Sequence, residues 1–235
     1  MPTRWRARRL SATARAGLAR PPVAGDDERG FQQTCVVGLD PMRVLVFGSG
    51  PLTGYGVTTR REAADGALAE LLAERTGRGA VVESRVRVDL PIREAVTSLG
   101  WAGTVTFGAA VWAPRFGEEL QHKHVWQHRT EVHAMLVDFR AQSSVPLVLC
   151  HLPTPLGLDW RTLLRRPRVA QFNRLLDEEA ALSPNTVTVD IGRYRPSEAA
   201  AIGAAWHRSV AEHLAPVVLQ ALGARDRTLT AAASA

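Results

Sequence analysis

The stretch Arg43-Val-Leu-Val-Phe47, followed by Gly48-Ser49-Gly50, decides the fold. A short apolar run that ends in glycines is typical of a strand buried on both faces of a parallel sheet. Residues 59–76 follow with apolar side chains at helical spacing, and Gly77 and Gly79 end that pattern. The two segments therefore predict a first strand and the helix that follows it.

The same alternation continues along the chain. Further strands are expected at residues 80–88, 104–107, 145–150 and 186–190, and further helices at 124–142, 169–182 and 197–222. Five strands alternating with helices predict one α/β domain, a three-layer α/β/α sandwich around a five-stranded, mainly parallel sheet. We expect this domain to span residues 42–222, after a disordered or mis-annotated extension (1–41) and before a flexible tail (223–235).

Composition narrows the class of protein. Of the 235 residues, 46% are hydrophobic and 22% are charged, which is ordinary for a globular domain. No apolar run approaches the roughly 20 residues that a membrane-spanning helix needs. Two cysteines, Cys35 and Cys150, cannot form a disulfide framework, so a cytoplasmic protein is expected.

A net charge of +6 raises the question of nucleic-acid binding. The basic residues are almost all arginine, with Lys123 as the single lysine, and alanine is abundant, a pattern typical of coding bias. Neither a zinc-finger spacing nor an RNA-binding aromatic signature accompanies the charge, so no nucleic-acid partner is expected.

In a sheet of this kind ligands bind beyond the carboxyl ends of the strands. One interpretation of the first such loop is a dinucleotide site, because Gly48-x-Gly50 follows a strand. The third glycine of that motif would fall on Thr53, and the acidic residue would be Glu83, more than 30 positions beyond Gly50. A Rossmann-type nucleotide-binding protein therefore stays as an alternative hypothesis.

A second interpretation rests on resemblance. Residues 44–57 (VLVFGSGPLTGYGV) resemble the first block of the SGNH (GDSL-type) hydrolase family, a strand followed by Gly-Asp-Ser-Leu-Thr and a glycine-rich turn. Residues 105–111 resemble the third block, a strand followed by Gly-x-Asn-Asp, and residues 187–199 resemble the last, Asp-x-x-His-Pro-Ser. The resemblance implies a flavodoxin-like three-layer fold and metal-free hydrolysis of esters or acyl groups on lipids or carbohydrates.

This chain departs from the family at the positions that carry the chemistry. The nucleophile position holds Gly50, with Ser49 one residue early, and the oxyanion asparagine position holds Ala110. The histidine position holds Arg195, the aspartate position holds Gly192, and no glycine stands at the second block, near residues 89–91. Arginine stays protonated in proteins and cannot act as a general base. The family's serine–histidine mechanism therefore has no complete set of residues here.

Other residues offer partial substitutes. Ser49 is a candidate displaced nucleophile, and His151, after the fourth expected strand, is the nearest candidate base. Cys150 precedes His151 on a strand, where neighbours point to opposite faces, so a small buried cysteine is expected rather than a Cys/His pair. Asp190 could orient a neighbour or cap a helix.

Arg195 and the histidines are further candidate binding groups. A guanidinium in the cleft could hold a carboxylate or phosphate, or it could pair with Glu198. His124 and His128 have a spacing that suits two metal ligands, but no HExxH motif surrounds them, and a solvated helix face is the simpler interpretation. No metal and no cofactor are expected.

The leading hypothesis is a non-catalytic member of the family that binds a small ligand or partner in the former active-site cleft. A serine esterase that uses Ser49 in a displaced geometry is the first alternative. The cleft is expected to include the residues named here: Gly48, Gly50, Gly108, Ala110, His151, Asp190 and Arg195.

Overall fold

The computed structural model describes residues 31–54, 56–87, 90–100, 107–115, 124–155, 160–194 and 203–233. The strands are β1 (Phe31–Val36), β2 (Met42–Gly48), β3 (Ala80–Val86), β4 (Ala109–Ala113), β5 (Leu147–Cys150), β6 (Thr154–Pro155), β7 (Thr186–Val189) and β8 (Arg193–Tyr194). The long helices are α2 (Ala64–Thr76), α4 (Val125–Gln142), α5 (Trp160–Leu182) and α6 (Ala204–Ala233), and the 3-10 helices are η1 (Gly50–Thr53), η2 (Arg60–Glu62), η3 (Ile92–Glu94) and η4 (Thr97–Leu99).

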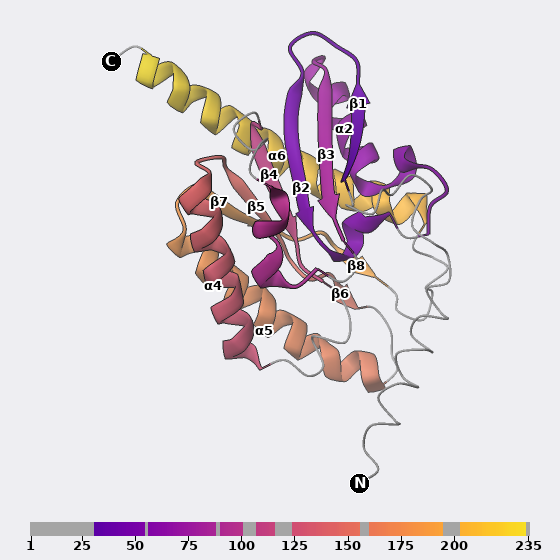
Figure 1. The fold of residues 1–235 in the computed structure, drawn as a ribbon. Coiled ribbons are helices and arrows are strands. Elements are labelled where there is room, and N and C mark those ends of the chain that lie inside the picture. The colour runs from indigo at the N-terminus through magenta and orange to yellow at the C-terminus, as the bar shows by residue number, and fades with distance from the viewer. Residues whose placement is uncertain are drawn as a thin grey trace.

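One sheet organises the chain, with strands in the order β1-β3-β2-β4-β5-β7 (Figure 1). From β3 to β7 every neighbouring pair is parallel, as predicted. β3 lies on one side of β2 and β4 lies on the other, so the order in which strands are added to the sheet reverses between β2 and β4. β1 joins the outer edge of β3 as an antiparallel strand, so the sheet has six strands rather than the five expected. β6 and β8 form a separate two-stranded parallel pair.

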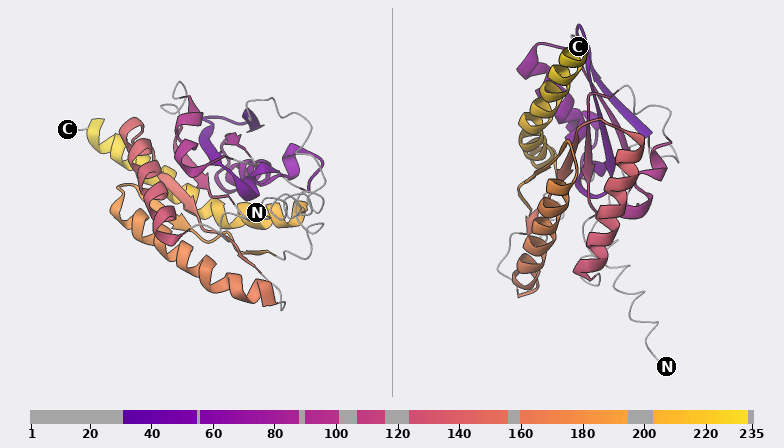
Figure 2. Two further views of the ribbon diagram at one scale, coloured as in Figure 1. Left: turned by 60° about the horizontal axis from the view of Figure 1, so that its bottom comes forward. Right: turned by 90° about the vertical axis from the view of Figure 1, so that its left-hand side faces the viewer.

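Helices cover both faces of this sheet, which produces the expected three layers (Figure 1, Figure 2). Along β2, Val44 and Val46 pack with residues of α2 and α6, whereas Leu45 and Phe47 pack with residues of α4 and α5. This alternation follows from the strand's period of two, and both sets are buried because helices lie on each side. The sheet is therefore the centre of the hydrophobic core.

Two elements extend beyond the predicted domain. β1 lies within the segment that was expected to be an extension, and its backbone pairs with β3 from Phe31 opposite Arg85 to Val36 opposite Ala80. α6 continues to Ala233 instead of ending at Leu222 (Figure 1). None of the helices in the described parts of the chain is both long and apolar enough to cross a membrane.

The third predicted strand is displaced. β4 runs from Ala109 to Ala113, whereas the sequence predicted a strand at 104–107, most of which lies outside the described residues. Gly108 is expected from the sequence to follow that strand, but it precedes β4, and its N–H donates to the carbonyl of Arg43 at 2.8 Å. This correction changes which residues reach the carboxyl edge of the sheet.

Candidate functional site

The carboxyl ends of β2 and β4 mark the point where the strand order reverses, which is where ligands bind in sheets of this type. Ser49 lies there, and its backbone N–H donates to the carbonyl of Ala113 at 2.9 Å. Gly48 adopts a φ of +107°, and a Cβ at this position would collide with the same Ala113 oxygen. The sequence needs glycine at 48 so that the loop can turn this close to β4.

The turn after Gly48 places neither a nucleophile nor a phosphate-binding helix at the surface. Ser49 is only 1% exposed, and Gly50, with a φ of +72°, opens the short η1. α2 does not begin until Ala64, so no long helix follows the glycines directly. A dinucleotide loop requires such a helix N-terminus, and the nucleotide hypothesis therefore loses its structural basis.

Gly108 and Ala110 do not share an edge with Ser49. Ala110 pairs with Leu45 in the first half of β4, and it is buried in the hydrophobic core. Because β2 and β4 are parallel, Gly108 and Ala110 lie toward the amino ends of these strands. The residues that follow β4 at the carboxyl edge are Pro114 and Arg115.

His151 follows β5 directly, as predicted, but its imidazole is held by a helix. Its Nε2 atom lies 2.9 Å from Oδ1 of Asp177 on α5, and the hydroxyl of Thr188 donates to the same oxygen at 2.6 Å. A base for Ser49 would need its imidazole within about 3.2 Å of the serine hydroxyl or linked to it through one water. The Nε2 atom of His151 is directed to Asp177 on α5.

Cys150 is fully buried, and it packs on the face of the sheet that α2 and α6 cover. Burial raises the pKa of its thiol, because an apolar environment disfavours the thiolate. The expectation of a small buried residue is confirmed. Only the thiolate is a good nucleophile, so Cys150 does not supply one.

The side chain of Asp190 accepts a hydrogen bond from its own loop. Its Oδ1 accepts the N–H of Gly192 at 2.8 Å, an Asx-type turn that Gly192 permits with a φ of +90°. This carboxylate therefore shapes the segment between β7 and β8. Arg195, the candidate anion-binding residue, lies outside the described residues.

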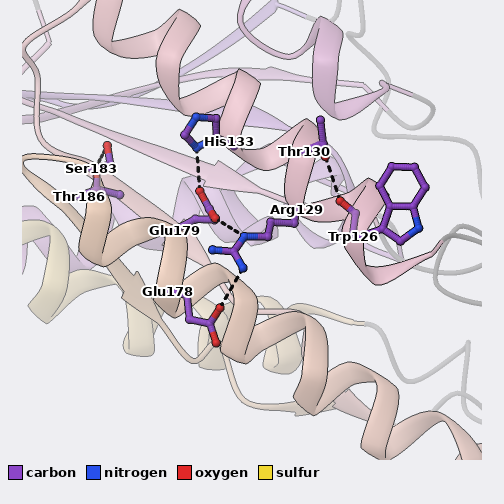
Figure 3. Close-up of polar contacts among 8 residues, drawn as sticks. All are labelled: Trp126, Arg129, Thr130, His133, Glu178, Glu179, Ser183 and Thr186. Atoms are coloured by element: carbon purple, nitrogen blue, oxygen red, sulfur yellow. Dashed lines mark hydrogen bonds and ion pairs between the residues drawn. The ribbon is translucent and has the colours of Figure 1, made fainter.

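The histidines of α4 do not converge on a metal. The expected solvated helix face is wrong for His128, which is buried with its ring edge-on to Phe172. His133 Nδ1 lies 2.9 Å from Oε2 of Glu179, and Figure 3 shows which side chains make this contact. Arg129 donates from Nε to the other oxygen of Glu179 at 2.7 Å. Among the described residues no group of three or more His, Cys, Asp or Glu side chains could hold a metal ion.

Two polar residues near the site were missed. Asn173 and Asp177 lie four residues apart on α5 and contact Leu152 and His151, which follow β5. The sequence shows that these two residues are four positions apart, a spacing that places them on one face of a helix. The sequence carries no signal for which strand end that face meets.

Sequence comparisons find no relatives, whereas structural comparisons do. Neither a protein-family model nor a curated protein sequence matches this chain. A lipase from a goat rumen metagenome matches with a TM-score of 0.57 at 12% identity, covering 77% of this chain and 97% of the lipase. An acetyl xylan esterase from Geobacillus stearothermophilus matches with a TM-score of 0.55 at 12% identity, covering 80% and 96%.

A member of the lipolytic G-D-S-L family from Veillonella parvula matches with a TM-score of 0.52 at 14% identity, covering 73% of this chain and 95% of that protein. At such identities the likeness concerns the arrangement of strands and helices. It extends over nearly the whole length of each of the three proteins.

Proposed function

We propose that this chain, which has the fold of the SGNH (GDSL-type) hydrolases, binds a small anionic ligand at the carboxyl edge of its sheet without hydrolysing esters. The observation that carries the proposal is the burial of Ser49, the serine at the reversal of strand order, which is only 1% exposed. Histidine is the usual partner that activates a serine nucleophile. His151, which directly follows β5, uses only its Nε2 atom in the contact with Asp177, so the proposal rests on the buried serine and not on the imidazole.

The chemistry of the other positions supports the same proposal. Gly50 stands where the family has its serine, and a glycine supplies no nucleophile. Ser49, one position earlier, is 1% exposed, so it offers little surface to an ester. Cys150 is buried, and its thiol has a raised pKa. Each candidate nucleophile at this edge of the sheet is therefore buried.

The anionic character of the ligand follows from Arg195. An arginine replaces the family's histidine, and a guanidinium binds a carboxylate or phosphate through two parallel hydrogen bonds. The described chain reaches Tyr194 at the end of β8, immediately before this arginine.

The first experiment tests for hydrolysis. The full chain is incubated with p-nitrophenyl acetate and p-nitrophenyl butyrate beside the variant Ser49→Ala. We expect both proteins to release p-nitrophenol at the same rate as buffer. Hydrolysis that disappears in the variant would identify a serine esterase, the alternative function, in which Ser49 acts from its place at the reversal of strand order.

The second experiment tests for binding. Thermal unfolding of the full chain is followed with increasing acetate and, separately, inorganic phosphate, because a ligand that binds only the folded state raises the Tm. The variant Arg195→Ala should lose this shift, whereas Arg174→Ala, which removes an exposed arginine of α5, should keep it. Equal shifts in both variants would mean that the anion binds elsewhere.

A further inference from the structure

β7 is the last strand at one edge of the main sheet, and in the described part of the chain no strand pairs with its outer side (Figure 1). On the inner side, the carbonyls of Asn185 and Val189 accept N–H groups from β5 and from the residue that follows it, at 2.9 and 2.8 Å. Backbone groups of successive residues in a strand point to alternate sides. The N–H and C=O groups of Thr186 and Thr188 therefore point outward, away from β5.

This edge lacks the sequence features that usually prevent pairing between molecules. The segment Pro184–Val189 (PNTVTV) contains no charged residue, although 22% of the chain is charged, and its proline precedes the strand. β7 pairs with β5 in continuous register, without a bulge. The side chain of Val187 is 43% exposed. Natural sheets protect their edges with charge, proline or bulges, so β7 is open to a further strand.

The geometry of β7 suits a second copy of itself. In an antiparallel pair centred on Val187, this valine lies opposite Val187 of the second copy. Thr186 of each copy then lies opposite Thr188 of the other, and two residues in such a pair exchange both of their N–H···O bonds. A single two-fold axis thus satisfies the outward backbone groups of both threonines, and the exposed valines cover each other.

Charges on one face of the sheet match across the same axis. Nη2 of Arg140, on α4, donates to the hydroxyl oxygen of Thr186 at 2.8 Å, whereas the hydroxyl of Thr188 donates to Oδ1 of Asp177, on α5, at 2.6 Å. Because Thr186 and Thr188 face each other in the pair, Arg140 of one copy comes beside Asp177 of the other. Opposite side chains in such pairs have Cβ atoms about 5 Å apart, so the two charges attract each other.

Arg140 has no carboxylate partner among the residues that the structure describes. Its remaining guanidinium contacts are uncharged oxygen atoms, those of Ser143, Val145, Ser183 and Asn185. Burial lowers the pKa of Arg140, because a desolvated guanidinium is less stable in its charged form. The side chain of Asp177 is 50% exposed and can reach a second molecule. An acid from a second copy would offset the cost of burying this arginine.

The end of α5 is apolar where it is level with the axis. The threonines of β7 contact residues on both sides of the stretch 178–182, so this stretch lies level with Val187. Its two glutamates contact Arg129 on α4 (Figure 3). Ala181 and Leu182 are exposed, Leu182 by 71%. A small and an apolar side chain allow the two copies of α5 to pack together.

We propose that two copies of this chain associate through β7, antiparallel and centred on Val187, so that their sheets become one continuous sheet. The hydrogen-bonding groups of the edge, the paired valines and the Arg140–Asp177 contact all follow from one two-fold axis. Because a strand of this length buries little surface, we expect a dissociation constant of about 10–100 µM.

Disulfide trapping tests the register. Val187→Cys is placed in a Cys35→Ser background, so that the exposed native thiol does not react. Residues opposite each other in a pair that is not hydrogen-bonded have Cα atoms about 4.5 Å apart, which a disulfide can span. Under mild oxidation this variant should form covalent dimers at least about tenfold faster than Val137→Cys, which alters a valine of α4 that is 54% exposed. Equal rates would overturn the proposal.

Sedimentation equilibrium of the full chain, at about 5–200 µM, tests the edge. Val187→Lys sets two like charges opposite each other and should weaken association by at least about tenfold. Gln33→Lys makes an exposed change on β1, at the other edge of the sheet, and should leave association unchanged. A parent chain that stays monomeric and forms no selective disulfide, or a larger effect of Gln33→Lys, would overturn the proposal. A strand of another protein would give the first of these results.

A third pair of variants tests the charges. Asp177→Asn keeps an oxygen for the hydroxyl of Thr188 and removes the charge, so it should weaken association by about fivefold, as expected for two partly exposed ion pairs in each dimer. Glu178→Gln makes the same chemical change one residue along α5, where the side chain contacts Arg129, and should have no effect. Equal effects of the two variants would overturn the contact between Arg140 and Asp177.

Discussion

Glu178 and Glu179 are neighbours in the sequence with opposite surroundings. The side chain of Glu178 is 52% exposed and lies 3.6 Å from Arg129, whereas that of Glu179 is 2% exposed and lies between Arg129 and His133 (Figure 3). A buried carboxylate is costly unless charged or hydrogen-bonded groups satisfy both oxygens, and α4 supplies one partner for each. This pair of contacts joins α4 to α5.

Replacing each glutamate in turn should separate the two surroundings. Glu179→Gln should lower the free energy of unfolding by about 1–3 kcal/mol, because two charge-assisted contacts to a buried group are lost. Glu178→Gln should change it by less than about 0.5 kcal/mol, as is usual for an exposed ion pair. Urea denaturation of both variants measures the difference, and equal effects would mean that burial of Glu179 has no energetic consequence.

Gly48 should tolerate no side chain. Gly48→Ala combines a φ of +107° with a collision between the new Cβ and the oxygen of Ala113, so we expect a loss of about 2–5 kcal/mol. Gly77 is the matched control, because it also has a positive φ, +68°, but nothing lies within 4 Å of a Cβ there. Gly77→Ala should cost about 1 kcal/mol in the same urea experiment.

A similar loss in both glycine variants would show that only backbone strain matters at position 48. The contact with Ala113 would then have no part in fixing the turn after β2.

The two cysteines should differ in reactivity. Cys35 is exposed, whereas Cys150 is buried and burial raises the pKa of its thiol, so less thiolate forms at a given pH. At pH 8 the folded chain should react with iodoacetamide at Cys35 only, and peptide mapping would identify the labelled site. In denaturant both should react. Rapid labelling of Cys150 in the folded chain would contradict its placement under α2 and α6.

Glu62 should titrate below its ordinary pKa of 4.5, because the N–H and then the hydroxyl of Thr58, followed by the N–H of Thr59, donate to its carboxylate. A lowered folded-state pKa favours folding at pH values above the unfolded pKa, and this contribution is lost as the pH falls through the folded-state value. Thr58→Ala removes the hydroxyl and should raise the pKa of Glu62 in an NMR titration. Thr76→Ala, which alters a hydroxyl at the far end of α2, should leave it unchanged.

Most of the fold was predictable, because the apolar residues of its buried strands and helices follow a regular spacing. The apolar run before Gly48 and the helical spacing after Ala63 predicted β2 and α2, and the arrangement of strands and helices matches that of a lipase and an acetyl xylan esterase. β1 was missed because Phe31–Val36 (FQQTCV) has little apolar alternation, and its pairing with β3 decides its conformation. Propensity is weak evidence for an edge strand.

The site was harder to predict, because an error of a few residues moves a side chain to the other end of a strand. Gly108 resembled a strand end, yet the space beside it is filled by Leu222 of α6, a contact between segments over a hundred residues apart. Because β4 begins at Ala109, Ala110 lies near the amino end of this strand and not at the carboxyl edge of the sheet. The partner of His151 was equally hidden, because helix packing rather than local sequence brings Asp177 to it.

β1 has a consequence for the solution behaviour of shortened chains. A protein begun at Met42 would lack this strand, and the outer backbone N–H and C=O groups of β3, from Ala80 to Arg85, would face water. An uncovered strand edge recruits strands from other molecules, which leads to intermolecular pairing and precipitation. The first residues that the structure describes thus cover the outer edge of β3, and work with shortened chains should retain them.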